Sequence, residues 1–487
     1  MTMTSRVTLI ILDGARPDVF RQLADRGDLP NLSRHLLDAP GGGTASATTV
    51  FPSTTGVAYL PFLTGCYPGT CDIPGIRWLD RRRYRGRWLR DREHVRSYCG
   101  YQRDRFDRDL PAGVVSMFDL EPDSVALCTP FTRGLGAGRE GVRRARALWG
   151  GLAHYTRGYG MLERAVGAAL VESAPRRHRF SFVVFPGVDG ITHCYHPEHP
   201  RVLATYREFD RMFGEFVAAT GGNGGPDPDH LILVVSDHGL STVARHTDIA
   251  LALEHLGIPT LRHPFHLWRR RPGAAVMVSG NASAQVYFHP GAPRRERYPV
   301  SALEAGLDGV PPGIASRLAE LPGVALVAGT EGAEVVVVGR EGRGRLSRAS
   351  AGLIAWCPDG GGGDGGWGDP LDLGGPGTRH QREWLALTHR GPFPDAPMQL
   401  LQLFRSERAG DLVVIAAPGT DLRADWEIPE HRSGHGSLHG EHMRCLVAAN
   451  RPLPEPIRTV DLFPLMLQHL GHPIPEGIDG AAPFSPP

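Results

Sequence analysis

The chain has 487 residues, a formal net charge of +1, and a composition that is 41% hydrophobic and 22% charged. This composition is typical of a soluble globular protein and unlike that of a disordered or membrane-embedded chain. The small net charge gives no global field to attract nucleic acid or an anionic membrane, so any anion binding must be local. All 53 basic residues are arginine, which excludes Schiff-base chemistry and a phosphate-loop lysine.

The amino terminus leads directly into an apolar run at residues 7–12. This run is too short to span a membrane and lacks a small-residue cleavage site, so we expect a strand and no signal peptide. The seven cysteines are odd in number and have no paired metal-ligand spacing. Without a signal peptide or a disulfide framework, the sequence predicts a cytoplasmic location.

Further apolar runs typical of strands occur at residues 180–185, 231–235, 412–416 and 445–449. Continuous apolar runs suit strands that are buried on both faces, and amphipathic stretches such as residues 202–216 suit crossover helices. The predicted fold class is therefore α/β, with a mostly parallel central sheet and helices on both faces. Residues 241–429 have their own helix and strand patterns and a glycine-rich run at 360–377, which predicts a large α+β insertion.

Carboxylate and imidazole side chains follow the predicted strands. Ligands of an α/β sheet bind beyond the carboxyl ends of its strands, and three carboxylates and three imidazoles would supply the ligands that two zinc-like cations prefer. Each of these residues taken singly is more often a cap or a core hydrogen-bond partner. The six residues are Asp13, Asp189, His193, Asp237, His238 and His435.

Hydroxyl side chains at Ser53, Thr54 and Thr55 precede an apolar stretch, residues 57–63, that is predicted to be helical. A two-metal hydrolase needs either a bound water or a side-chain alkoxide as its nucleophile, and a bound cation lowers the pKa of a hydroxyl without a neighbouring base. The sequence therefore predicts a two-metal hydrolase with a hydroxyl residue from this segment at its centre.

Five motifs, in this order, resemble the type I phosphodiesterase / nucleotide pyrophosphatase branch of the alkaline phosphatase superfamily. They are Leu12-Asp13-Gly14, the segment from Phe51-Pro52 to Thr64-Gly65-Cys66-Tyr67-Pro68, Asp189-x-x-x-His193, Asp237-His238-Gly239 and His435-Gly436. The segment 459–464 also resembles the closing helix of that superfamily. The resemblance covers residues 5–240 and 430–482, which it implies form the catalytic core, and leaves residues 241–429 as an insertion or cap subdomain.

The resemblance also implies roles for single residues. In that branch the nucleophile stands nine positions before the threonine of Thr-Gly-x-Tyr-Pro, which selects Thr55, with Thr54 as the alternative. The metals implied are two divalent ions, with zinc preferred. One would be held by Asp13, Asp237, His238 and Thr55, and the other by Asp189, His193 and His435. A second His-Gly pair makes His439 an alternative to His435.

Two departures from the family pattern bear on the substrate. The nucleophile is approached through Ser53-Thr54-Thr55, and Arg77 stands where the branch places a phosphoryl-contacting asparagine after the Tyr-Pro turn. An arginine there would favour a dianionic monoester, although Arg77 could equally face solvent within the arginine-rich stretch 77–108. A sulfatase is disfavoured because neither Cys66-x-Pro68 nor Cys128-x-Pro130 is followed by the arginine of that motif.

The function expected is hydrolysis of phosphodiester or pyrophosphate bonds through a covalent phosphothreonine intermediate. The alternatives are a phosphomonoesterase or phosphonate hydrolase that uses the same site, and a metal-binding homologue without turnover. The partner expected is a small phosphoric ester or nucleotide-like molecule, with no nucleic acid polymer and no membrane span.

Overall fold

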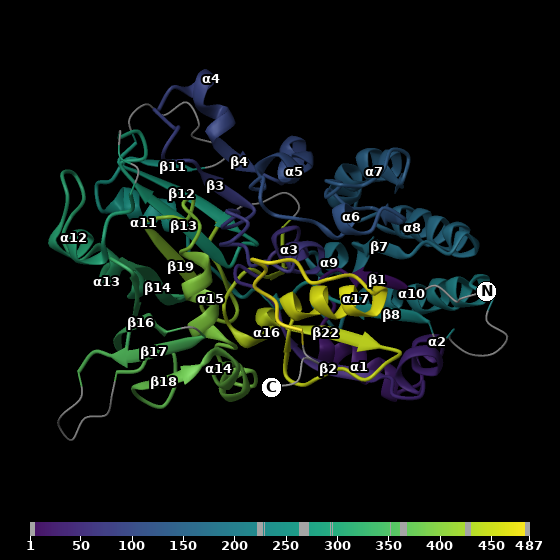
Figure 1. Cartoon of the computed structure of the whole chain (residues 1–487). Helices are drawn as coiled ribbons and strands as arrows, with labels where there is room; N and C mark the ends of the chain where they lie inside the picture. The colour runs from purple at the N-terminus through teal and green to yellow at the C-terminus, as the bar shows by residue number, and fades with distance from the viewer. Residues whose placement is uncertain are drawn as a thin grey trace.

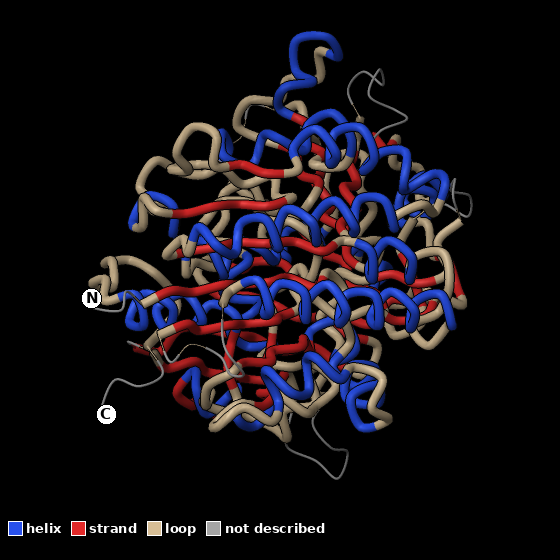
Figure 2. Tube along the Cα trace, turned by 90° about the vertical axis from the view of Figure 1, so that its right-hand side faces the viewer, coloured by secondary structure: helices blue, strands red, loops and turns tan. Residues whose placement is uncertain are grey.

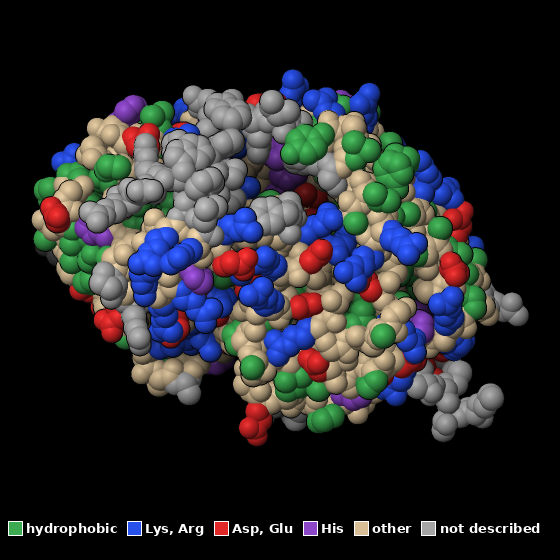
Figure 3. Space-filling model, turned by 90° about the horizontal axis from the view of Figure 1, so that it is seen from above, with side chains coloured by type: hydrophobic (Ala, Val, Ile, Leu, Met, Phe, Trp, Pro, Cys, Tyr) green, Lys and Arg blue, Asp and Glu red, His purple; other side chains and the backbone are tan. Residues whose placement is uncertain are grey.

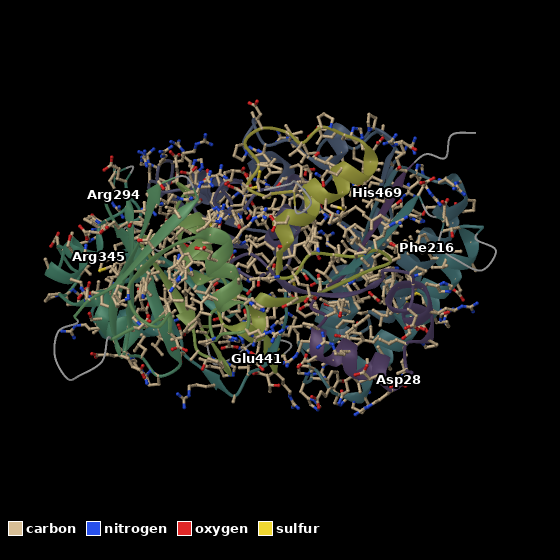
Figure 4. The ribbon with its side chains drawn as sticks, turned by 60° about the horizontal axis from the view of Figure 1, so that its bottom comes forward. Asp28, Phe216, Arg294, Arg345, Glu441 and His469 are labelled. Atoms are coloured by element: carbon tan, nitrogen blue, oxygen red, sulfur yellow. The ribbon has the colours of Figure 1, made fainter. Side chains whose placement is uncertain are left out.

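The computed structural model describes residues 5–221, 227, 229–262, 272–292, 294, 296–350, 352–360, 368–423 and 430–482. Two large sheets lie side by side (Figure 1). Figure 4 shows Arg294 and Arg345 in the part that carries one sheet, and Phe216 and His469 in the part that carries the other. Among the described residues, no helix is long and apolar enough to cross a membrane.

The central sheet has eight strands in the order β23-β2-β22-β8-β1-β7-β5-β6. β22 runs antiparallel to β2 and β8, and all other neighbours in the sheet are parallel. This confirms the predicted mostly parallel sheet. The strands are β1 (Arg6–Leu12), β2 (Gly43–Thr48), β5 (Ser124–Leu127), β6 (Glu140–Gly141), β7 (Phe180–Phe185), β8 (His230–Val235), β22 (Arg444–Ala449) and β23 (Ile457–Arg458).

The middle of this sheet is buried because most residues of its strands are apolar. Every residue of β1, β7 and β8 is buried. α17 (Leu462–Leu470) packs on β1, α8 (Gly160–Ser173) on β5 and β7, and α1 (Pro17–Asp25) on β22. Helices lie in front of the strands in Figure 2. The predicted helix at 202–216 is observed as α10 (Pro200–Ala219), which packs against α8.

The second sheet has nine strands in the order β11-β12-β13-β19-β14-β15-β16-β17-β18. They are β11 (Thr260–Arg262), β12 (Ala274–Ser279), β13 (Ser283–Phe288), β14 (Val324–Glu331), β15 (Glu334–Gly339), β16 (Gly342–Ser350), β17 (Leu353–Pro358), β18 (Gly377–His380) and β19 (Leu412–Ala416). The predicted strand at 412–416 therefore exists, but it belongs to this sheet and not to the central one. An apolar run indicates that a strand is buried, but it does not show which other strand it pairs with. Of the glycine-rich run 360–377, residues 361–367 lie outside the described residues.

One helix of this second part supports the segment that leads to Thr55. Two glutamines of α15 (Ala396–Leu403) bind the backbone of Phe51: Gln399 Oε1 accepts from the Phe51 nitrogen at 2.9 Å, and Gln402 Nε2 donates to its carbonyl at 2.7 Å. Both glutamines are fully buried. The predicted insertion thus contributes directly to the position of the hydroxyl segment.

Candidate metal centre

The predicted ligands lie at the carboxyl ends of three neighbouring parallel strands. Asp13 follows β1, Asp237 follows β8 after one residue, and Asp189 lies on α9 (Gly187–Thr192), which follows β7. Because β1 pairs with β7 on one side and with β8 on the other, their carboxyl ends meet at one edge of the sheet. The backbone nitrogen of Asp189 donates to the Asp13 carbonyl at 3.0 Å, which fixes α9 against the end of β1.

The six side chains form two groups, and in each group the ligand atoms lie within 4.8 Å of one another. The groups adjoin, because the His238 and His435 rings stack with their centroids 3.8 Å apart. This division is the one that the family resemblance implied. The first group is Asp13, Asp237 and His238, and the second is Asp189, His193 and His435.

The three imidazoles are oriented by backbone carbonyls. His193 Nδ1 lies 2.8 Å from the Ser433 carbonyl, His435 Nδ1 3.1 Å from the Ser53 carbonyl, and His238 Nδ1 3.0 Å from its neighbour's carbonyl at Gly239. A carbonyl only accepts, so each Nδ1 carries the proton and each Nε2 keeps its lone pair. This is the tautomer in which metal-ligating histidines are held.

The Nε2 atoms face carboxylates. His238 Nε2 is 3.3 Å from Asp237 Oδ2 and 3.5 Å from Asp13 Oδ1, and His193 Nε2 is 3.4 Å from Asp189 Oδ1. Asp189 Oδ1 and Asp237 Oδ2 are buried, and neither has a hydrogen-bond partner among the described residues. Buried carboxylate oxygens without a donor are costly, and a cation between these oxygens and the imidazole nitrogens would satisfy both. The donor set therefore fits two divalent cations.

The electrostatics of the cluster agree with that fit. Burial raises the pKa of Asp13 well above its usual range, and the charges of Asp237 and Asp189 raise it further. Burial also raises the pKa of Asp237. For Asp189, burial raises the pKa, but positive charge at His193, His435 and His238 outweighs burial and lowers it, as positive charge from cations bound there would also do. Three clustered carboxylates can all be ionised at neutral pH only if cations offset their mutual repulsion.

Thr55 is the hydroxyl that reaches the first group. Its Oγ1 lies 2.9 Å from His238 Nε2 and 3.3 Å from Asp13 Oδ1. The Thr54 hydroxyl is buried and has no hydrogen-bond partner among the described residues. After Gly56 the chain forms a 3-10 turn (Val57–Tyr59) and then α3 (Leu60–Thr64), in place of the single predicted helix at 57–63.

Gly14 shows why the sequence has glycine after Asp13. Its φ of +68° lies in the left-handed region, and a Cβ there would stand 2.9 Å from Asp189 Cβ and 2.6 Å from Leu240 Cδ1. Its backbone nitrogen donates to Asp237 Oδ1 at 3.1 Å. Only a residue without a side chain at position 14 therefore lets the turn after β1 approach both ligand groups.

Two predicted residues lie apart from the groups. His439 is buried beside His442, with ring centroids 3.9 Å apart, and burial lowers the pKa of His439 to about 3. It belongs to neither ligand group. Arg77, in β3 (Arg77–Leu79), donates through Nη1 to the Val278 carbonyl at 3.0 Å. Among the described residues, no hydrogen bond or ion pair joins Arg77 to the six ligands.

Two residues at the site were missed in the sequence. The Tyr59 hydroxyl donates to Asp13 Oδ2 at 2.6 Å, but its place in an apolar stretch marks it only as core. His431 stacks on His193 with centroids 4.4 Å apart. Its position four residues before His435 was the available signal, although no spacing rule separates such a neighbour from a ligand.

The fold and the site together define a class: α/β proteins that gather two aspartate–histidine groups around a hydroxyl at the carboxyl edge of the sheet. The model of the type I phosphodiesterase / nucleotide pyrophosphatase family matches residues 7–298. The chain belongs to this family, within the alkaline phosphatase superfamily, and is a hydrolase that acts on phosphoric esters.

Solved structures with the same fold include phosphonoacetate hydrolase from Sinorhizobium meliloti 1021 in complex with phosphonoacetate, with a TM-score of 0.55, 17% identity and 96% of each chain covered. They also include the murine ectonucleotide pyrophosphatase / phosphodiesterase 5, with a TM-score of 0.55, 12% identity and 96% of each chain covered. At these identities the likeness concerns the fold alone. A comparison of the sequence with curated proteins gave no match.

Proposed function

We propose that this protein hydrolyses phosphodiester or pyrophosphate bonds of small molecules, with Thr55 as the nucleophile and a phosphothreonine as the intermediate. The observation that carries the proposal is the position of Thr55 Oγ1, 2.9 Å from His238 Nε2 and 3.3 Å from Asp13 Oδ1. No other hydroxyl of the segment 53–55 reaches either group among the described contacts: Ser53 Oγ donates instead to the Ser437 carbonyl at 2.7 Å.

The residues that would hold two divalent cations are the two groups described above, with zinc preferred because the donors are imidazole nitrogens and carboxylate oxygens. Bound there, such ions would supply Lewis-acid stabilisation of the attacking and leaving oxygens and would lower the pKa of the Thr55 hydroxyl. The carbonyls of Ser53, Ser433 and Gly239 hold the imidazoles in the tautomer that this requires.

In the first step the Thr55 oxygen attacks phosphorus, a new oxygen–phosphorus bond forms, and the bond to the leaving oxygen breaks. In the second step water cleaves the phosphothreonine and regenerates the hydroxyl. Asp13 is kept in place by the Tyr59 hydroxyl and Asp237 by the Gly14 nitrogen. The site thus keeps the nucleophile and its surroundings fixed through both steps.

The contacts of Arg77 support a diester over a dianionic monoester. Arg77 makes no hydrogen bond or ion pair to the six ligands among the described residues, and its Nη1 donates instead to the Val278 carbonyl. A phosphodiester monoanion needs no extra cation, whereas a dianion would gain most from one. Phosphonate hydrolysis is the second candidate, because one structure of the same fold is a phosphonoacetate hydrolase.

The test compares bis-p-nitrophenyl phosphate, p-nitrophenyl phosphate and phosphonoacetate as substrates of the zinc-loaded protein and its Thr55→Ala variant. We expect the diester to be preferred and Thr55→Ala to lower kcat by at least about 10³-fold, as removal of a covalent nucleophile does. Zinc content should stay at two ions per chain.

Thr54→Val is the matched control, because it removes a neighbouring hydroxyl that has no described hydrogen-bond partner and should retain turnover. Substantial activity in Thr55→Ala would refute the role of Thr55 as the nucleophile. If activity is lost only in Thr54→Val, the nucleophile is Thr54; if both variants stay active, the nucleophile is water. Turnover of phosphonoacetate alone would replace the diester assignment by the phosphonate one. A zinc-loaded protein that is inert on all three compounds and never phosphorylated at Thr55 would support a homologue without turnover.

A further inference from the structure

Large hydrophobic side chains are exposed on α7 (Arg143–Thr156) and at the start of α8. Leu148 is 70% exposed, Tyr155 67%, Leu152 48% and Met161 44%. We call these four residues the α7 surface. The other exposed large hydrophobic residues among the described side chains are scattered along the chain: Val115, Leu251, Leu387 and Ile474.

The α7 surface is not needed to attach α7 to the protein. Ala145, Trp149 and Ala153, spaced four residues apart, form the inner side of the helix: Ala153 is buried, and Ala145 and Trp149 pack against the core of the central sheet. Leu148 and Leu152 are also four residues apart and form a second stripe on another side. A contiguous exposed apolar stripe marks an interaction surface more often than a fold requirement.

Two of the arginines around this stripe have no acidic partner among the described residues. Residues 141–161 contain four arginines and no acidic residue, but Arg143 pairs with Glu140, and Arg146 pairs with Glu140 and Asp104. Arg144 and Arg157 are exposed, and no ion pair is present for either among the described residues. The charge complements an anionic partner. It disfavours a second copy of the chain docked through the same surface, which would place arginines against arginines.

The turn that follows α7 reaches the elements that carry the second ligand group. Arg157 follows α7, and its guanidinium carbon is 5.7 Å from the ring centre of Tyr195, two residues after His193. The Tyr159 ring rests on α9, where a Cβ on Gly190 would stand 2.0 Å from the ring. Figure 3 shows a hollow with histidine and acidic side chains at its floor, and hydrophobic and arginine side chains beside it.

We propose that the α7 surface docks the protein onto an anionic lipid surface. Leu148, Leu152 and Tyr155 would enter the boundary between headgroups and acyl chains, while Arg144 and Arg157 contact the phosphates, as in amphipathic helices that lie in the plane of a membrane. α7 lies at the outer edge of the molecule (Figure 1). A helix there can meet a flat surface. This inference goes beyond the proposed function and does not depend on turnover.

The experiment measures flotation of the full-length protein with vesicles of phosphatidylcholine, with and without phosphatidylglycerol. We expect binding to the anionic vesicles only, weakened by added salt. The double variant Leu148→Ser/Leu152→Ser should lower partitioning about tenfold for each leucine lost from the apolar phase. The matched control Leu251→Ser/Leu387→Ser removes two exposed leucines, 41% and 53% exposed, on α11 (Ile249–His255) and α14 (Gln381–Thr388), and should bind as the unaltered protein does.

Hydrolysis of a small water-soluble ester should be unchanged in both double variants, and Thr55→Ala should still float with anionic vesicles. The test of vesicle binding is therefore independent of the test of catalysis. The proposal is overturned if anionic vesicles are not bound at low salt, if neutral vesicles bind equally, or if Leu148→Ser/Leu152→Ser binds unchanged. A dimer in sedimentation that is lost only in that variant would assign the surface to a second copy of the chain instead.

Discussion

Tyr59→Phe should weaken the first ligand group without disturbing the fold. The Tyr59 hydroxyl donates to Asp13 Oδ2 at 2.6 Å, and the side chain is 3% exposed. Phenylalanine keeps the ring contacts with Phe131 and Phe182, whose centroids lie 6.4 and 6.3 Å away. The substitution therefore removes one hydrogen bond and leaves the packing.

The size of the effect follows from the nature of that bond. A buried hydrogen bond to a charged group contributes about 1.5–3 kcal/mol, and loss of a group that supports a metal ligand typically lowers metal affinity by about 10–100-fold. These two figures agree, because a tenfold change in affinity is about 1.4 kcal/mol. We expect zinc affinity at the Asp13 group to fall within that range, and kcat/KM to fall with it.

Competition with a chromogenic chelator measures zinc affinity in Tyr59→Phe and in Tyr84→Phe. Tyr84 is the control because it is 2% exposed and its hydroxyl has no hydrogen-bond partner among the described residues. Its loss should leave both zinc affinities unchanged. The role of Tyr59 in supporting Asp13 would be refuted if zinc affinity were unaltered in Tyr59→Phe, or if it fell equally in Tyr84→Phe.

Burial raises the pKa of Glu163 to about 8, from 4.5 in the unfolded chain, although its Oε1 accepts from the Gly187 nitrogen at 2.7 Å. The folded protein holds this proton more tightly, so stability should fall as pH rises from about 4.5 to 8, by on the order of a few kcal/mol. Urea unfolding across that range should show a shallower decline for Glu163→Gln, and parallel curves would contradict the assignment. Arg458 makes two 2.7 Å hydrogen bonds to Asp395, and both side chains are buried. Arg458→Met should cost about 3–5 kcal/mol because it leaves a buried carboxylate unpaired; a loss below about 1 kcal/mol in urea unfolding would disprove that role.

Much of the central sheet could be predicted because several of its strands are continuous apolar runs, which can be recognised within the segment itself. The run 180–185 matches β7 to the residue, and the runs at 7–12, 231–235 and 445–449 each miss one residue of the observed strand. Such mostly apolar runs are typical of strands that are covered on both faces. The acidic residues that follow them are equally local signals, which is why Asp13, Asp189 and Asp237 could be placed at strand ends.

Other strands of the same sheet carry no such signal. β2 reads Gly-Thr-Ala-Ser-Ala-Thr and has three half-buried residues, while β5 is four residues long. β2 becomes a strand because β22 and β23 supply hydrogen bonds on its two sides. Pairing between segments about 400 residues apart leaves no pattern within either segment.

Local apolar runs and short motifs in a fixed order were enough to predict the fold class, the family and the six candidate ligands, but not Tyr59 or His431. Which of these groups meet depends on the tertiary structure. It placed His435 beside His238 and kept His439 outside both groups, although the two His-Gly pairs look alike in sequence. It also brought Tyr59 to Asp13 and the glutamines of α15 to Phe51. Such contacts join segments that are distant along the chain, and packing, not sequence spacing, selects them.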